Sequence, residues 1–251
     1  MTIMAAPIRW FDELDSTNAE AMRLAQVGEA GPVWIAARRQ SAGRGRRGRV
    51  WETGQGNLAA TLLMTLDMPP AEAAQLSFVT ALAAGDLLRA YAPNAPVAYK
   101  WPNDVLIGGE KACGILIESG PRAGQGLWLA IGVGVNLTSA PEGTEFPATS
   151  LAAHLPGPPP SPEAALDRLA NAMAERISAW RSDGFSPVRE AWLDAAFGLG
   201  QPCAARLGRE TLRGVAEGLD IDGALVLRLD DGSSRRITAG DIMFDPSTSS
   251  G

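Results

Sequence analysis

Basic side chains concentrate in one short segment, the arginine loop, which spans residues 38–49 (RRQSAGRGRRGR). It contains six arginines and three glycines, whereas the whole chain of 251 residues has a formal net charge of −6. Planar guanidinium groups bind phosphate and carboxylate oxygens through paired hydrogen bonds. Gly43, Gly45 and Gly48 allow close approach of the backbone to a ligand. The segment predicts an anion-binding loop, with a solvated loop or a nucleic-acid arm as alternatives.

Histidine and cysteine are scarce, and this excludes several kinds of site. The chain has one histidine, His154, and two cysteines, Cys113 and Cys203. A catalytic triad would need His154, which stands beside a proline run, and a four-ligand Cys/His zinc site cannot be assembled. We expect two free thiols. No apolar run reaches the ~20 residues of a membrane helix and no signal peptide is visible, so we expect a cytoplasmic protein without a membrane partner.

The spacing of apolar residues predicts an α+β fold, a mixed β-sheet with helices on one face. Ser16 or Thr17 should cap a first helix that ends at Gly28. Further helices are expected over 69–91, 163–180 and 187–197, and strands over 33–37, 57–66, 97–101, 105–107, 111–118 and 127–137. Four short strands, over 203–207, 211–217, 224–229 and 234–238, predict a small β-barrel or sandwich. The expected division is therefore a main domain over 1–198, which the resemblance described next implies is catalytic, a C-terminal domain over 199–245 and a disordered tail over 246–251.

Four segments in a fixed order carry a resemblance to a known family. They are DSTN at 15–18, the arginine loop followed by Val50 and Trp51, KWPNDV at 100–105 with GEKACGILIE at 109–118, and IGVGVNL at 131–137. Together they resemble the biotin protein ligases, in the short form that lacks the N-terminal DNA-binding domain. The resemblance implies a catalytic domain like that of class II aminoacyl-tRNA synthetases, an SH3-like C-terminal barrel and no repressor activity.

The same resemblance implies a two-step reaction. Biotin and ATP, supplied with Mg²⁺, give biotinyl-5′-AMP and pyrophosphate, and a lysine of an apo biotin carboxyl carrier domain then takes the biotinyl group. Biotin's carboxylate is already ionised and needs no general base, but it must approach a polyanion, so positive charge is the main requirement. No tightly bound cofactor and no DNA partner are expected, and the protein would be a monomer or homodimer.

Site residues follow from the resemblance position by position. The implied catalytic residues are Lys111, Arg46 and Arg49. The implied biotin site comprises Ser16, Thr17, Asn18, Gln40, Gly43, Arg44, Gly45, Arg46, Lys111, Gly114 and Gly132. The implied nucleotide site comprises Arg46, Arg49, Trp51, Asn103, Lys111 and Asn136. Gly134 would be a further backbone wall, Asp104 lies in a segment that could bind metal or phosphate, and the metal ligands are unassigned.

Each assignment has a structural alternative. Ser16 and Thr17 could only cap a helix, Trp51 could pack in the core, and Asn136 could satisfy a strand end. Lys111 could remain in solvent at a hairpin. Cys113 could be a nucleophile, as in lipoate-handling transferases, but buried cysteine usually packs as a small apolar side chain, and we favour packing.

Two other functions compete with biotin ligation. A lipoate or octanoate ligase or transferase shares the scaffold, but its arginine motif resembles RRxSGGG with a histidine nearby, whereas Gln40 follows Arg39 here. A nucleic-acid-binding protein would use the arginine loop and the small β-domain. The sequence pI near 4.9 and the absence of aromatics among the arginines argue against it.

Overall fold

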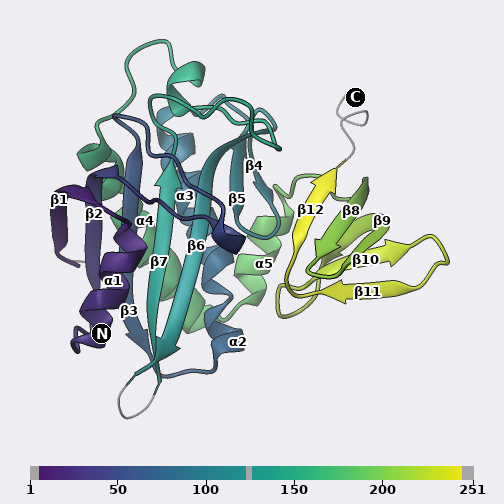
Figure 1. Ribbon diagram of the computed structural model, residues 1–251. Helices are drawn as coiled ribbons and strands as arrows, with labels where there is room; N and C mark the ends of the chain where they lie inside the picture. Colours follow the sequence, from purple (N-terminus) through teal and green to yellow (C-terminus); the bar gives the residue numbers. More distant parts are fainter. Residues whose placement is uncertain (1–5, 123–125, 245–251) are drawn as a thin grey trace.

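The computed structural model describes residues 6–122 and 126–244, which form two sheets flanked by helices (Figure 1). The larger sheet has seven strands in the order β1-β2-β3-β7-β6-β5-β4, in which β1 and β2 run parallel and the other neighbours antiparallel. Its strands are β1 (Ile8–Leu14), β2 (Val33–Gln40), β3 (Leu58–Leu66), β4 (Val97–Lys100), β5 (Asp104–Ile107), β6 (Glu110–Pro121) and β7 (Leu127–Val135).

Helices pack on both faces of this sheet. Figure 1 shows α3 and α4 behind the sheet and α1 in front of it. The helices are α1 (Thr17–Gln26), α2 (Pro70–Ala73), α3 (Leu76–Tyr91), α4 (Pro162–Asp183) and α5 (Ser186–Leu193), with single 3₁₀ turns η1 (Arg46–Gly48) and η2 (Leu151–His154). This confirms the α+β class with a mixed sheet, but the helices were expected on one face only, and α1 covers the other because Ala21 packs on Val33 and Ile35 there. The helix expected over 69–91 is divided by a turn at Ala74 and Gln75, and none of the described helices is long and apolar enough to cross a bilayer.

Strand β2 shows why the central strands are apolar throughout. Trp34 and Ala36 pack in the large core on the α3 side, whereas Val33 and Ile35 pack in a smaller core beneath α1. Successive side chains of a strand point to opposite faces, so a sheet covered on both sides requires a continuous apolar run. The apolar side chains of β2 therefore pack into both cores.

Helix α1 begins over the middle of the sheet. Ser16 is its N-cap, with the Ala19 amide donating to Ser16 Oγ at 3.5 Å. The cap therefore falls to Ser16, and the hydroxyl of Thr17 is left for other contacts. Thr17 and Asn18, in the first turn, are buried against the sheet.

The C-terminal sheet is antiparallel, with five strands in the order β11-β10-β9-β8-β12. They are β8 (Pro202–Leu207), β9 (Glu210–Leu219), β10 (Leu225–Leu229), β11 (Ser234–Ile237) and β12 (Asp241–Phe244). The first four correspond to the predicted strands, whereas β12 was not expected. The tail predicted over 246–251 lies outside the described residues.

The turn between β9 and β10 fastens the C-terminal sheet to the larger sheet. Trp101 Nε1 donates to the carbonyl oxygen of Gly223 at 3.1 Å. Gly223 has a φ of +90°, and a Cβ there would lie 2.6 Å from the ring of Phe78. The turn therefore needs glycine for its backbone conformation and for the space beside Phe78.

We expect Gly223→Ala to lower the free energy of unfolding by about 1–3 kcal/mol more than Gly232→Ala, because overpacking adds to the backbone strain. Gly232 is a matched control, since its φ is +82° and nothing lies within 4 Å of its Cβ position. Denaturant unfolding of the two variants measures the difference. Equal losses of stability would contradict this account of the docking turn.

Candidate active site

The strand register arranges two adjacent rows of residues across the face of the sheet that carries α1. Directly opposed residues share a face, so each row forms a line across several strands. The first row is Thr61, Gly132 and Leu116, and the second is Ala59, Gly134, Gly114, Asp104 and Lys100. The three glycines leave a floor without side chains between α1 and the sheet edge at β4.

A cavity of about 310 Å³ lies over this floor. Every residue predicted for the site lines it except Gly43: Ser16, Thr17, Asn18, Gln40, Arg44, Gly45, Arg46, Arg49, Trp51, Asn103, Asp104, Lys111, Gly114, Gly132, Gly134 and Asn136. Gly43 is buried just behind, where a Cβ would lie 2.2 Å from the Trp51 carbonyl oxygen. Segments distant in sequence thus meet at one place.

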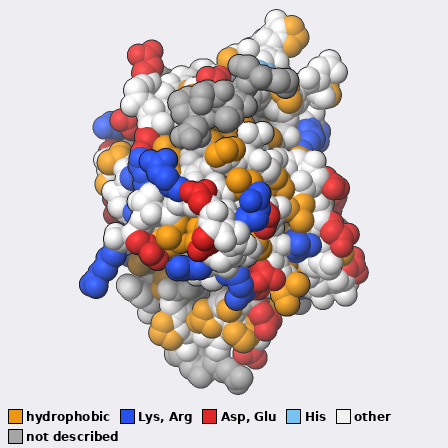
Figure 2. Space-filling view, turned by 90° about the vertical axis from the view of Figure 1, so that its right-hand side faces the viewer, with side chains coloured by type: hydrophobic (Ala, Val, Ile, Leu, Met, Phe, Trp, Pro, Cys, Tyr) orange, Lys and Arg blue, Asp and Glu red, His pale blue; other side chains and the backbone are white. Residues whose placement is uncertain are grey.

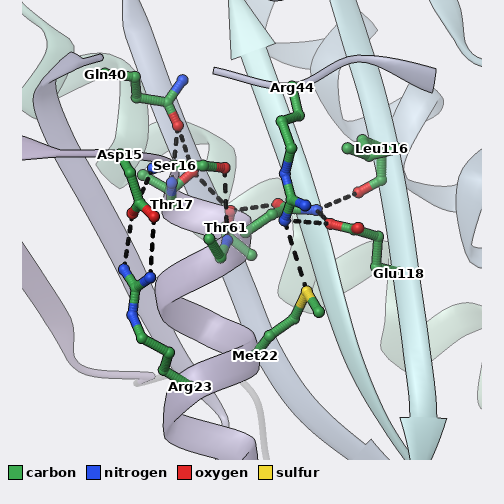
Figure 3. A network of polar contacts seen from close by, with 12 residues as sticks. Asp15, Ser16, Thr17, Met22, Arg23, Gln40, Arg44, Thr61, Leu116 and Glu118 are labelled. Carbon is green, nitrogen blue, oxygen red and sulfur yellow. Dashed lines mark hydrogen bonds and ion pairs between the residues drawn. The ribbon is translucent and has the colours of Figure 1, made fainter. Parts of the chain in front are cut away.

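Hydroxyl and amide groups form the end of the cavity beneath α1, the polar end (Figure 3). The Thr17 amide donates to Gln40 Oε1 at 2.8 Å. Thr61 Oγ1 lies 2.8 Å from Thr17 Oγ1 and 2.7 Å from Asn18 Oδ1. A Cβ on Gly132 would lie 2.2 Å from Asn18 Oδ1. The polar groups are therefore fixed in orientation directly against the bare floor.

Glu118, which the sequence analysis did not single out, joins the arginine loop to the polar end (Figure 3). Its Oε2 accepts from Asn18 Nδ2 at 2.8 Å and lies 3.5 Å from Arg44 Nη2. The same guanidinium contacts Met22 Sδ at 3.6 Å. Arg44 is consequently held near the polar end by a carboxylate of β6.

The tip of the arginine loop contacts both sheets. Arg46 Nη1 donates to Asn103 Oδ1 at 3.2 Å, and burial lowers the pKa of Arg46. Arg47, whose φ is +56°, and Arg49 both donate to the carboxylate of Asp241, at 3.1 and 2.9 Å. Asp241 is a second residue that the sequence analysis missed, because it belongs to the unexpected strand β12.

Trp51 and Lys111 lie over the glycine floor. Cβ atoms on Gly134 and Gly114 would lie 2.3 and 2.7 Å from the Trp51 ring, so only glycine allows the indole to rest there. Lys111 Nζ is 5.5 Å from the ring centroid and 2.6 Å from Asp104 Oδ1. Lys111 is thus ion-paired inside the cavity, which differs from the solvated alternative.

Asn136 lines the cavity and has an acceptor without a partner among the described residues. Its side chain is 2% exposed, and its Nδ2 donates to the Thr149 carbonyl oxygen at 3.1 Å. Its buried Oδ1 has no hydrogen-bond partner among residues 6–122 and 126–244. Leaving such an atom unpaired is costly, so it favours a ligand with an N–H donor.

The environment of Cys113 agrees with packing. The side chain is fully buried, and burial raises the pKa of the thiol to about 12. A thiolate, which nucleophilic attack requires, is therefore strongly disfavoured near neutral pH.

Within the described part of the chain no cluster of three or more His, Cys, Asp or Glu side chains is arranged to hold a metal ion.

Comparison with known proteins places the chain among characterised ligases. The pattern of the biotin/lipoate A/B protein ligase family matches residues 10–136, and that of the biotin protein ligase C-terminal domain matches residues 198–245. A biotin–[acetyl-CoA-carboxylase] ligase of Paracoccus denitrificans is 47% identical over 220 residues, covering 85% of this chain and 91% of the relative. The chain belongs to the biotin/lipoate A/B protein ligase family.

Solved ligases share the architecture along nearly the whole chain. Biotin protein ligase of Aquifex aeolicus, in complex with biotin and ATP, is 25% identical with a TM-score of 0.79, covering 95% of this chain and 98% of that one. The Leishmania major enzyme in complex with biotinyl-5-AMP is 27% identical with a TM-score of 0.65, covering 94% and 100%. Both sheets of this protein therefore have counterparts in solved members of the family.

We expect Cys113 to resist thiol reagents at pH 8 in the folded protein, because its thiol is buried and protonated. Cys203 is also buried, so both thiols should react fully only in denaturant. Timed alkylation followed by peptide mass analysis measures each site. Rapid alkylation of native Cys113 would contradict the packing role.

Proposed function

We propose that this protein activates biotin with ATP to biotinyl-5′-AMP, releasing pyrophosphate, and then transfers biotin to a lysine of a biotin carboxyl carrier domain. The observation that carries the proposal is the two-ended cavity. Its polar end and its cationic end, with Lys111, Arg46 and Arg49, are joined by a floor of glycines. An uncharged head group with an anionic tail fits this arrangement.

The polar end suits the ureido ring of biotin. A cyclic urea has one carbonyl acceptor and two N–H donors, so it suits hydroxyl and amide groups that both donate and accept. Ser16, Thr17 and Gln40 supply such groups where α1 meets the floor. Gly132 and Gly114 let Asn18, Trp51 and Lys111 lie close to the sheet, and the cavity beside these side chains takes the fused rings and the acyl chain.

The cationic end suits adenylation. A carboxylate oxygen of biotin attacks the α-phosphorus of ATP, and the bond from that phosphorus to the β-bridging oxygen breaks, so pyrophosphate leaves with the electron pair. Lys111, between the carboxylate and the α-phosphate, and the guanidiniums of Arg44 and Arg46 stabilise the charge on both reactants and on the transition state. Arg49 contacts phosphate. Magnesium would arrive with ATP and add charge there.

Two residues that line the same cavity can bind the adenine base. Trp51 offers a half-buried indole for stacking on adenine. Asn136 Oδ1 accepts from the exocyclic amino group, and Asn103 holds Arg46 near the phosphates. In the second step the acceptor amine attacks the acyl carbon, an amide forms and AMP leaves.

We assign the catalytic step to a domain over residues 1–198 and a supporting role to a C-terminal domain over 199–245. The carrier domain is the macromolecular partner. A monomeric or homodimeric state and a cytoplasmic location stay predictions.

The rival substrate within the family is lipoate. Its dithiolane ring has neither an N–H donor nor a carbonyl acceptor, so it would cover the hydroxyl and amide groups of the polar end without pairing with them. Incubation with ATP and either biotin or lipoate, followed by mass measurement of an apo carrier domain, decides between them. We expect biotinyl addition only, and lipoyl addition without biotinyl addition would overturn the proposal.

Nucleic-acid binding finds little support on the surface. On the face shown in Figure 2, acidic and basic side chains are interspersed rather than separated into a basic stripe. Arginines of the C-terminal sheet pair with neighbouring carboxylates, as Arg228 does with Glu217 and Arg235 with Glu210. A polyanion would have to compete with these pairs.

We expect Lys111→Ala to reduce the rate of biotin-dependent pyrophosphate release by roughly 100-fold or more, because the ammonium acts mainly on transition-state charge. Biotin affinity, measured by calorimetry, should change far less, since the polar end is intact. An unchanged rate of pyrophosphate release would refute the assigned role of Lys111.

A further inference from the structure

Lysine is rare in this chain. Of the 22 basic residues only two are lysines, Lys100 and Lys111, and both line the cavity. Lys111 is ion-paired with Asp104. Lys100, by contrast, makes no ion pair within the described residues, and the adenylation chemistry set out above does not use it.

Lys100 is buried where an unpaired charge is costly. Its side chain is only 5% exposed, and its Nζ lies 4.8 Å from the ring centroid of Phe146. Its neighbour Tyr99 packs in the core on the α3 side, so the alternation of the strand directs Lys100 to the cavity face. Burial lowers the pKa of Lys100, which reflects the cost of holding this ammonium away from water.

The position of Lys100 along the second row shows which part of a ligand it meets. The row passes from Gly114 on β6 to Asp104 on β5 and ends at Lys100 on β4. Adjacent strands are about 4.8 Å apart, so Lys100 stands roughly 10 Å beyond the glycine floor, on the side away from the polar end. A nucleotide whose α-phosphate lies at Lys111 would bring its remaining phosphates to Lys100 if they extend toward β4.

We propose that Lys100 binds the β- and γ-phosphates of ATP and the pyrophosphate that leaves. This inference rests on the proposed adenylation and adds a residue to it. When the bond between the α-phosphorus and the β-bridging oxygen breaks, negative charge accumulates on pyrophosphate, and the ammonium of Lys100 stabilises that charge without transferring a proton.

A lysine suits this position better than an arginine. Its ammonium is a compact charge that binds phosphate as a point, whereas a guanidinium is a wide planar fork. With Phe146 on one side and Asp104 opposite across the hairpin, a compact cation fits this end of the cavity. Bound phosphates would offset the free-energy cost of burying the Lys100 ammonium, which makes no ion pair with any residue that the structure describes.

Two lysines allow a direct spectroscopic test. Protein labelled with ¹³C on lysine should show two side-chain signals, and Lys100→Met identifies the one from Lys100. We expect pyrophosphate and α,β-methylene-ATP to shift the Lys100 signal, and AMP, which has no β- or γ-phosphate, to leave it nearly unchanged. An equal shift with AMP, or none with pyrophosphate, would overturn the proposal.

Kinetics of Lys100→Met test the same contact by another route. We expect KM for ATP in adenylation, and KM for pyrophosphate in the reverse reaction, to rise by about tenfold to a hundredfold, the range for a lost charged hydrogen bond. Biotin affinity and thermal stability should not fall, because methionine fills the site and removes an unpaired buried charge. Normal KM values, or slowing confined to transfer from preformed adenylate, would contradict the assignment.

Arg168→Met is the matched control. Arg168 also lies over an aromatic ring, with its Cζ 5.7 Å from the ring centroid of Tyr91, but it is an exposed residue of α4. It should leave both KM values unchanged. If the parent protein binds biotin but forms no biotinyl-5′-AMP, the proposed function fails, whereas adenylation by the parent with unaltered KM values in Lys100→Met refutes only the role of Lys100.

Discussion

Repulsion between a carboxylate and a triphosphate is the constraint around which this cavity is built. Two like-charged groups must come within bonding distance in a site of about 310 Å³, so positive charge has to surround them on several sides. Arginines of the loop line one side of the cavity, and Lys111 and Lys100 line it from the sheet. The glycines of β6 and β7 let Asn18, Trp51 and Lys111 lie directly against the sheet, where they border the cavity.

Internal carboxylates hold most of these cations before any ligand arrives. Asp241 accepts from Arg47 and Arg49, Glu118 lies beside Arg44, and Asp104 pairs with Lys111. Such pairs limit repulsion among the arginines and fix the loop near its working position. Ligand anions must therefore compete with protein carboxylates. The C-terminal sheet also borders the cavity, since Asp241 of β12 supplies the carboxylate that accepts from Arg47 and Arg49.

Local sequence patterns predicted most of the individual helices and strands. They could not predict contacts between segments that are distant in the chain. The apolar run of β3, the glycine hairpin after β5 and the cap before α1 each depend on neighbouring residues, and they were predicted correctly. Strand register depends on pairing between distant segments, so the line from Gly114 to Lys100 could not be read from the chain. Asp241 was missed because β12 was not recognised as a strand and its contact with Arg47 joins segments far apart in the chain. Lys100 carried one signal, the rarity of lysine, that could have singled it out.

Calorimetric titration of biotin, with and without saturating α,β-methylene-ATP, tests the central claim most directly. If the cavity screens its two anionic ligands, the nucleotide analogue should tighten biotin binding by a factor of about five or more, and biotin should tighten binding of the analogue by the same factor. Without such screening the two anions would repel each other inside one cavity. Biotin binding that is unchanged or weakened by the analogue would contradict the account.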